Sequence, residues 1–190
     1  SEYVMYNGTV YRDTPIITGS TSADDNGLKK IANSTRTGYY LRKLLRDDCN
    51  PNSAQQLAQF HYPVYFRYTE LFLAYAEAAN EAWGPRNAGS VGYSAYDVIK
   101  AIRQRAGLGV GGNDPYLETC AGNPEMMREL IRNERRIELC FENKRFWDMR
   151  RWKLDLNETA KGMKIDQNGG ALQYTVIDVE PRNYTDHMYY

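Results

Sequence analysis

Apolar side chains recur at the three- and four-residue spacing of an α-helix between residues 67 and 83. Gly84 and Pro85 come directly after this stretch and are typical of a helix end. A second helix is predicted to begin after Ser94, because Ser94 and Asp97 have the spacing of an N-terminal capping box. The two helices would form a hairpin in which the first buries one apolar stripe. That stripe consists of Tyr68, Leu71, Phe72, Tyr75, Ala78, Ala79 and Ala82.

A second helix hairpin is predicted between residues 123 and 153. Asn123 is suited to cap a helix that has Pro124 at its first position, and residues 107–122 before it are interpreted as a loop rich in Gly, Asn and Pro. A shorter helix is expected over residues 145–153. The longer helix of this pair has one face that is apolar apart from two glutamates. The members of that face are Met127, Leu130, Ile131, Glu134, Ile137, Glu138 and Phe141.

Two β-hairpins are predicted near the ends of the chain. Residues 2–6 and 9–12 flank Asn7-Gly8, a pair that favours a tight hairpin turn. Residues 163–165 and 172–179 flank a polar, glycine-containing stretch and form the second predicted hairpin. The fold class is therefore mostly α, with helix hairpins that stack as repeats and two small β-hairpin or loop excursions.

Composition excludes several classes of function. The 190 residues contain 24 Lys and Arg against 24 Asp and Glu, and this balance argues against nucleic-acid binding. No apolar run is long enough for a transmembrane helix. Three cysteines without CxxC spacing and two histidines predict neither a disulfide framework nor a metal site. Residues 107–112 match GxGxxG but lack the strand and helix that a dinucleotide site needs, so no cofactor is predicted.

Two pairs of carboxylates have helical i, i+4 spacing: Glu77 with Glu81, and Glu134 with Glu138. Such a pair can meet the separation of about 5–10 Å that a glycosidase needs. Many arginines surround the second pair, and they would lower a carboxyl pKa, which is the wrong direction for a general acid. We therefore favour an ion network that joins the third and fourth predicted helices. A hydrolase remains the alternative if a carboxylate pair lies in an open cleft.

Aromatic side chains are the other notable group, with 16 Tyr, 5 Phe and 3 Trp. A tyrosine ring has an apolar face and a polar tip, which suits both protein interiors and polar, ring-shaped ligands. Trp83 is expected to pack between the hairpins, and Trp147 and Trp152 to dock their helix on its neighbours. Tyr6 and Tyr11 lie in or next to the first predicted β-hairpin.

One segment resembles the signature of a known family. Residues 130–152 read LIRNERRIELCFENKRFWDMRRW, which is similar to the signature of the SusD/RagB family. Three more stretches fit this family in the same order: residues 37–43, 67–81 and 99–108. Asn143 stands where the family usually has glycine, and asparagine can also adopt a left-handed conformation.

The resemblance implies a function that composition did not show. Members of the family are surface lipoproteins of the bacterial outer membrane that bind glycans, or in some cases peptides, without catalysis. They deliver ligand to a SusC-type TonB-dependent transporter, and their fold is built on tetratricopeptide-like helix hairpins. Attachment to the membrane would be through a lipid anchor that this chain does not contain. Neither an enzyme activity nor a nucleic-acid partner is implied.

The resemblance also bears on domain organisation, because family members are more than twice as long. Residues 1–190 are expected to be one domain or the C-terminal part of a larger protein. Within them we expect a loop-rich region with a β-hairpin (1–60), the helix hairpins (61–153), and a β-hairpin with a tail (154–190).

The glycan is expected to contact the early loop region. The candidate binding residues are Tyr6 and Tyr11 for ring stacking, with Asn7 and Arg12 as polar partners. The alternative is a helical-repeat scaffold that binds a protein or peptide and has no sugar site.

Overall fold

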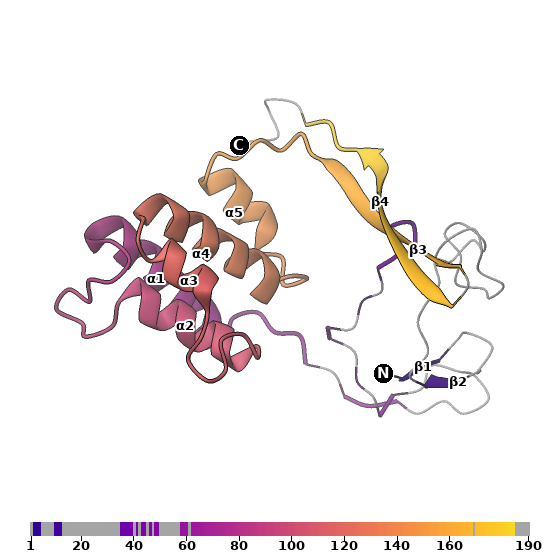
Figure 1. Ribbon diagram of the computed structural model, residues 1–190, viewed down its shortest axis with the longest axis horizontal. Helices are drawn as coiled ribbons and strands as arrows, with labels where there is room; N and C mark the ends of the chain where they lie inside the picture. The colour runs from indigo at the N-terminus through magenta and orange to yellow at the C-terminus, as the bar shows by residue number, and fades with distance from the viewer. Residues whose placement is uncertain are drawn as a thin grey trace. The chain divides into compact units, whose positions relative to one another are not determined.

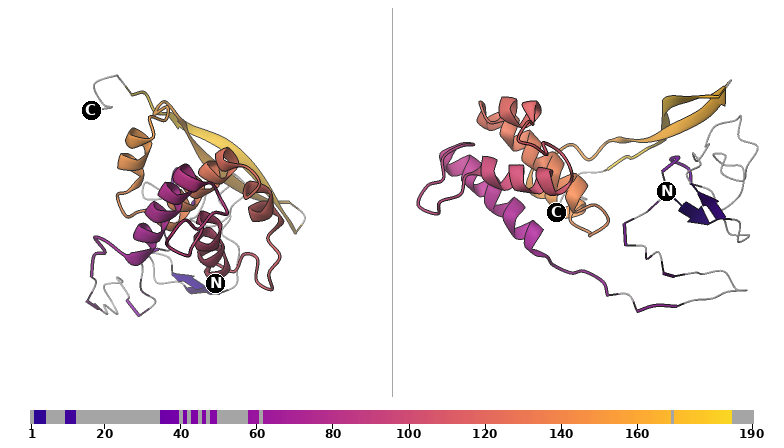
Figure 2. Two further views of the ribbon diagram at one scale, coloured as in Figure 1. Left: turned by 90° about the vertical axis from the view of Figure 1, so that its left-hand side faces the viewer. Right: turned by 60° about the horizontal axis from the view of Figure 1, so that its bottom comes forward.

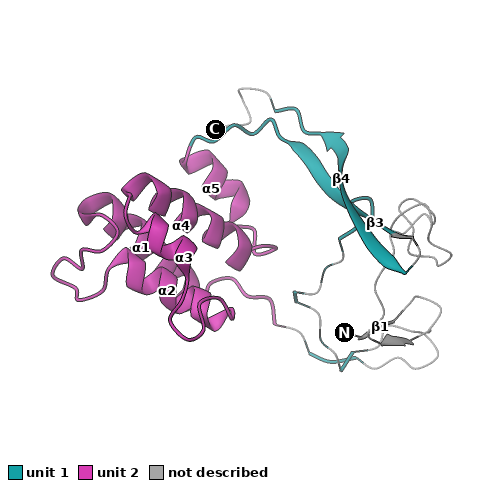
Figure 3. Cartoon of the chain, in the orientation of Figure 1, with its two compact units in different colours: residues 1–61, 153–190 teal, residues 62–152 magenta. Residues whose placement is uncertain are grey.

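The computed structural model divides into two compact units, residues 62–152 and residues 1–61 with 153–190 (Figure 3). Each boundary differs by one residue from the corresponding boundary of the subdivision expected from sequence, which itself stays a prediction. Whether residues 1–190 form one domain or part of a larger protein stays a prediction. The structure describes residues 2–4, 10–12, 35–39, 41, 43–44, 46, 48–49, 58–60, 62–168 and 170–184.

The unit of residues 62–152 is entirely helical in its regular structure (Figures 1 and 2). The contacts of α1 with both α2 and α4 bring the two predicted helix hairpins together. The mostly helical fold class is thereby confirmed. The helices are α1 (Tyr68–Trp83), α2 (Ala95–Arg105), α3 (Pro115–Cys120), α4 (Pro124–Glu138) and α5 (Arg145–Arg151).

The predicted helix starts are confirmed by their caps. The Ser94 side chain accepts a hydrogen bond from the Asp97 backbone N–H, and the Asp97 carboxylate accepts one from the Ser94 N–H at 2.9 Å. The Asn123 side chain accepts from the Glu125 N–H at 2.8 Å, with Pro124 at the first helical position. Both caps satisfy backbone donors that the helix itself leaves without partners.

The expected loop over residues 107–122 is wrong, because it contains α3. The Asp114 side chain accepts a hydrogen bond from the Leu117 N–H at 3.1 Å, and Pro115 occupies the first turn. Leu117 and Cys120 are 1% and 0% exposed, so this short helix contributes to the core. An aspartate followed by proline is a helix start as well as a loop signal.

The predicted buried face of α1 is also wrong. Of its seven residues only Ala79 is buried; the buried residues of α1 are Leu73, Ala76, Ala79 and Asn80. Apolar side chains occur on every side of this helix, so their spacing did not select one face. The core of the helical unit consists of Leu73, Ala76, Ala79, Ala95, Ile99, Ile102, Leu117, Cys120, Ala121, Met127, Leu130, Ile131 and Leu139.

The predicted face of α4 is correct only over its first part. Ile137 and Phe141 are 56% and 65% exposed, whereas Met127 and Leu130 are buried. The reason is that α4 ends at Glu138 and Phe141 has a positive φ of 61°, so the helical spacing does not continue to Phe141.

Both predicted β-hairpins are confirmed as antiparallel strand pairs. Strands β1 (Glu2–Val4) and β2 (Val10–Arg12) pair with Tyr3 opposite Tyr11. Strands β3 (Thr159–Asn168) and β4 (Ala171–Pro181) pair with Met163 opposite Val176, and both are longer than predicted.

Gly162 in β3 is required by a close backbone approach. A Cβ atom there would lie 2.7 Å from the Thr37 carbonyl oxygen, which accepts a hydrogen bond from the Met163 N–H. In the described part of the chain, no helix combines the length and the apolar character needed to cross a membrane.

Candidate functional site

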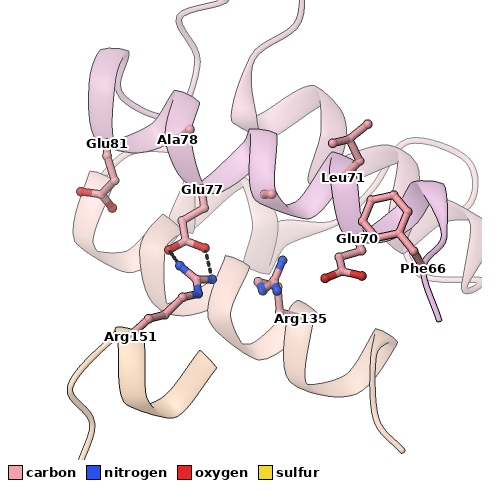
Figure 4. Close-up of a pocket in the computed structure, with 9 residues that line it drawn as sticks. Phe66, Glu70, Leu71, Glu77, Ala78, Glu81, Arg135 and Arg151 are labelled. Carbon is pink, nitrogen blue, oxygen red and sulfur yellow. Dashed lines mark hydrogen bonds and ion pairs between the residues drawn. The ribbon is translucent and has the colours of Figure 1, made fainter. Parts of the chain in front are cut away.

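An open groove of about 410 Å³ runs along one side of α1, within the helical unit (Figure 4). Its volume lies in the range of small-molecule sites, which is about 300–1,000 Å³. Helix α1 and Phe66, two residues before it, supply most of the lining, and α4 and α5 each add an arginine. The lining residues are Phe66, Glu70, Leu71, Ala74, Glu77, Ala78, Glu81, Arg135 and Arg151.

Glu77 is the most strongly bonded carboxylate of the groove. It accepts two hydrogen bonds of 2.6 Å from the Arg151 guanidinium, which points at it in Figure 4, and one of 2.7 Å from the Trp152 indole N–H. Burial opposes ionisation of Glu77, but the hydrogen bonds from Arg151 and Trp152 outweigh it and hold its pKa below the ordinary value. Glu77 is therefore an anion at neutral pH.

The other two carboxylates of the groove are paired as well. Glu81 accepts two hydrogen bonds from Arg128, of 2.6 and 2.7 Å, and these bonds lower its pKa. Glu70 forms an ion pair with Lys144 at 2.9 Å. Glu77 and Glu81 thus lie beside an open groove, as the hydrolase alternative required, but each is held by an arginine.

The pair Glu134 and Glu138 belongs to an ion network, as expected, but its partners differ from those predicted. Glu134 accepts a hydrogen bond of 2.6 Å from Arg103 on α2. Glu138 pairs with Arg67, at 2.7 Å, and with Arg105. The expected link between α4 and α5 is made by other residues. Three arginines of α4 bond other acids: Arg128 bonds Glu81 on α1, Arg132 bonds Glu129 on α4 itself, and Arg135 bonds Asp148 on α5.

Glu138 is unsuited to donate a proton at neutral pH. Burial raises the pKa of Glu138, but hydrogen bonds from Arg105 and Arg67 lower it further than burial raises it. A glycosidase acid needs the opposite shift, towards a raised pKa. Among the described residues, no three His, Cys, Asp or Glu side chains gather as the ligands of a metal ion would.

Four aromatic rings between residues 62 and 68 are exposed, and the expectations from sequence missed them. The exposed fractions of Tyr62 and Tyr65 are 80% and 85%. Lys144 donates a hydrogen bond of 3.1 Å to the Tyr65 carbonyl, and Arg67 donates two to Glu142, so these bonds anchor the segment to the connection between α4 and α5. The high density of aromatic residues over 60–68 was the sequence signal that could have revealed this exposed aromatic segment.

The tryptophans differ from expectation. Trp147 is 67% exposed, and its ring meets Phe146 edge-on at 5.0 Å instead of docking on a neighbouring helix. Trp83 is 41% exposed, so it is only partly covered. Trp152 is half-buried through its bond to Glu77 and is the one that docks α5 as expected.

The glycan-binding residues expected from sequence are only partly placed. Tyr6 and Asn7 lie outside the described residues. Tyr11 and Arg12 lie on β2, opposite Tyr3 and Glu2 in the strand register. Whether these four residues form a site stays a prediction.

Comparisons with known proteins agree on one family. The model of the SusD family matches residues 1–189. A SusD-like protein P2 from Formosa agariphila is 36% identical over 103 residues, which are 54% of this chain and 19% of that protein. The crystal structure of a SusD-like protein from Bacteroides fragilis is 33% identical, with a TM-score of 0.49, and the match covers 67% of this chain and 22% of that one.

Proposed function

Because this chain belongs to the SusD family, we propose that it takes part in non-catalytic glycan binding at the cell surface. The bound oligosaccharide would be delivered to a SusC-type TonB-dependent transporter in the outer membrane. The protein itself would be a lipoprotein attached to the surface of that membrane. The observation that carries the proposal is the match of the family model over residues 1–189. The relatives share only part of their length with this chain, so these activities and partners belong to the proposal.

The chemistry of the described side chains supports binding rather than hydrolysis. Glu77, Glu81 and Glu138 each accept hydrogen bonds from arginine and have lowered pKa values, so they stay ionised at neutral pH. An ionised carboxylate cannot act as the general acid that cleaves a glycosidic bond. Exposed aromatic rings such as Tyr62 and Tyr65 show that the chain presents flat apolar faces to solvent.

The proposed binding residues remain Tyr6, Asn7, Tyr11 and Arg12. Tyrosine rings would stack on the apolar face of a pyranose, because their faces are apolar and their rings are rigid. The Asn7 amide and the Arg12 guanidinium would donate hydrogen bonds to sugar hydroxyls.

Affinity electrophoresis tests this function directly. The chain is run through gels that contain soluble α-glucan, β-glucan, xylan or mannan, and its mobility is compared with that in a plain gel. We expect retardation by one glycan and loss of that retardation in the double variant Tyr6→Ala/Tyr11→Ala. Tyr174→Ala is the matched control, since Tyr174 is an exposed tyrosine on β4.

Three results would argue against the proposal in different ways. Retardation that survives the double variant would reject the two tyrosines but keep glycan binding. No retardation by any glycan, together with binding to peptides, would favour the helical-repeat scaffold without a sugar site. Release of reducing sugar from a retained glycan would contradict the non-catalytic assignment.

A further inference from the structure

The loop between α1 and α2, residues 84–94, is fixed to two of the helices beside it. Tyr75 on α1 donates a hydrogen bond of 2.5 Å to the Tyr93 carbonyl oxygen. Arg86 donates one of 2.5 Å to Glu118 on α3. A loop that is held at several points keeps its exposed side chains in one arrangement, and this lowers the entropy cost of binding a ligand.

Trp83, the last residue of α1, packs against this loop but is not buried by it. A Cβ atom at Gly89 would lie 2.8 Å from Cζ3 and 2.9 Å from Cε2 of the indole. These two atoms lie on opposite sides of the six-membered ring, so Gly89 lies over the ring face. The Trp83 side chain is still 41% exposed, and none of the described residues accepts a hydrogen bond from its indole N–H. Trp83 therefore keeps both apolar ring surface and a donor that the fold does not use.

Asn87 lies next to the same glycine with its amide held in one orientation. Its Oδ1 accepts a hydrogen bond of 2.9 Å from the Gly89 N–H. The Nδ2 atom carries two N–H donors, and neither is bonded within the described part of the chain. Because Gly89 contacts both side chains, the Trp83 indole and the oriented Asn87 amide lie beside each other.

The charges near Trp83 in the sequence are already neutralised. The charged residues within five positions of it are Glu81 and Arg86. Arg128 pairs with the first at 2.6 Å, and Glu118 pairs with the second. A ligand of this loop would therefore meet no unbalanced charge, which favours a neutral ligand.

An aromatic ring beside amide donors, without net charge, fits a neutral sugar. The apolar face of a pyranose can stack on an indole, and its oxygens can accept hydrogen bonds from an amide. The loop is less suited to a protein partner, because three of residues 84–93 are glycines and present little apolar area.

We propose that Trp83 and Asn87 form a further glycan-contact site, at which a neutral pyranose stacks on the indole and accepts hydrogen bonds from the Asn87 amide. This inference rests on the proposed glycan binding. It adds residues of the helical unit to the four candidates of the first β-hairpin.

The substitution Asn87→Asp separates ligand binding from loop structure. The carboxylate keeps an acceptor for the Gly89 N–H but has no N–H to donate to a sugar. We expect the glycan that retards the wild type to bind this variant about three- to tenfold more weakly, as for the loss of one hydrogen bond. Affinity electrophoresis over a range of α-glucan, β-glucan or mannan concentrations measures the dissociation constants. Asn113→Asp, at an exposed asparagine of the loop before α3, is the matched control for the added charge and should bind like the wild type.

NMR of the ¹⁵N-labelled chain tests whether the sugar lies at Trp83. The indole N–H signals are assigned by substituting each tryptophan with leucine in turn. A soluble oligosaccharide of the retarding glycan should shift the Trp83 signal. The signal of Trp147, which is 67% exposed on α5, should stay in place.

The outcomes distinguish this site from the function on which it rests. Equal affinities of the wild type and Asn87→Asp, or an unmoved Trp83 signal while oligosaccharide is bound, would overturn the site and leave glycan binding intact. If no glycan retards the wild type, glycan binding and the site are rejected together.

Discussion

Arg135 on α4 and Asp148 on α5 form a buried ion pair in which each side chain is only 6% exposed. The guanidinium donates two hydrogen bonds of 3.0 Å to the two carboxylate oxygens. Helix α5 has seven residues, which is too short for a helix to be stable by itself. The pair therefore fixes α5 on α4, and Arg151, also bonded to Asp148, extends the link to Glu77 on α1.

A double-mutant cycle on this pair should show strong coupling. Arg135→Ala and Asp148→Ala should each lower the free energy of unfolding by about 3–5 kcal/mol, because each leaves a charge buried without its main partner. The double variant should lose clearly less than the sum of the two. Urea denaturation measures the free energy of unfolding of the wild type, the two single variants and the double variant. Additive losses of unfolding free energy would mean that the two side chains are not coupled. Glu129→Ala, at an exposed glutamate that pairs with Arg132, is the control for a small loss.

Glu134→Ala should destabilise the protein through α2 rather than α5. Glu134 accepts a hydrogen bond from Arg103, whose pKa is raised by the hydrogen bonds that it donates to Asp114 and Glu134, with burial opposing this effect. Arg103 also donates a hydrogen bond of 2.6 Å to Asp114, a partner that the substitution does not remove. We therefore expect a loss of about 3 kcal/mol, the low end of the range for a broken buried pair.

The matched variant is Asp114→Ala, which also removes the cap of α3. It should lower the free energy of unfolding by at least as much as Glu134→Ala. Urea denaturation measures both. Wild-type stability of Glu134→Ala would show that Asp114 alone satisfies Arg103.

The helix ends could be predicted from sequence because their signals are local. The Ser94 side chain and Asp97 satisfy the first backbone donors of α2 within four residues, and Asn123 with Pro124 does the same for α4. Such contacts need no knowledge of the rest of the fold. The six-residue helix α3 was missed since it is too short to show helical periodicity.

Contacts between helices could not be predicted in the same way. Helix α1 is apolar on several sides, so only the positions of α2 and α4 decide that Leu73 is buried while Leu71 is exposed. The arginine partner of Glu134 was ambiguous for a similar reason: arginines occur on α2, α4 and α5, and the tertiary packing selects Arg103. The groove along α1 has no sequence signature because residues of three helices line it.

The carboxylate of Glu77 should make stability depend on pH in the acid range. Its pKa in the folded protein is lowered, since hydrogen bonds from Arg151 and Trp152 outweigh the effect of burial. The unfolded chain, with an ordinary glutamate pKa of about 4.3, therefore binds a proton more readily than the folded one. The stabilisation is complete above that pKa and is lost as the pH falls through the lower folded value.

Glu77→Gln should remove this contribution and flatten the acid limb of the stability profile. At about pH 7 we expect a loss of about 1.5–3 kcal/mol, the range for hydrogen bonds to a charged group. The difference from wild type should shrink as the pH falls below the ordinary glutamate pKa and the wild-type carboxylate begins to be protonated. Urea denaturation at several pH values measures it, with Glu129→Gln as the control on an exposed glutamate. A difference that stays constant from neutral to acid pH would show that Glu77 acts through packing and not through its charge.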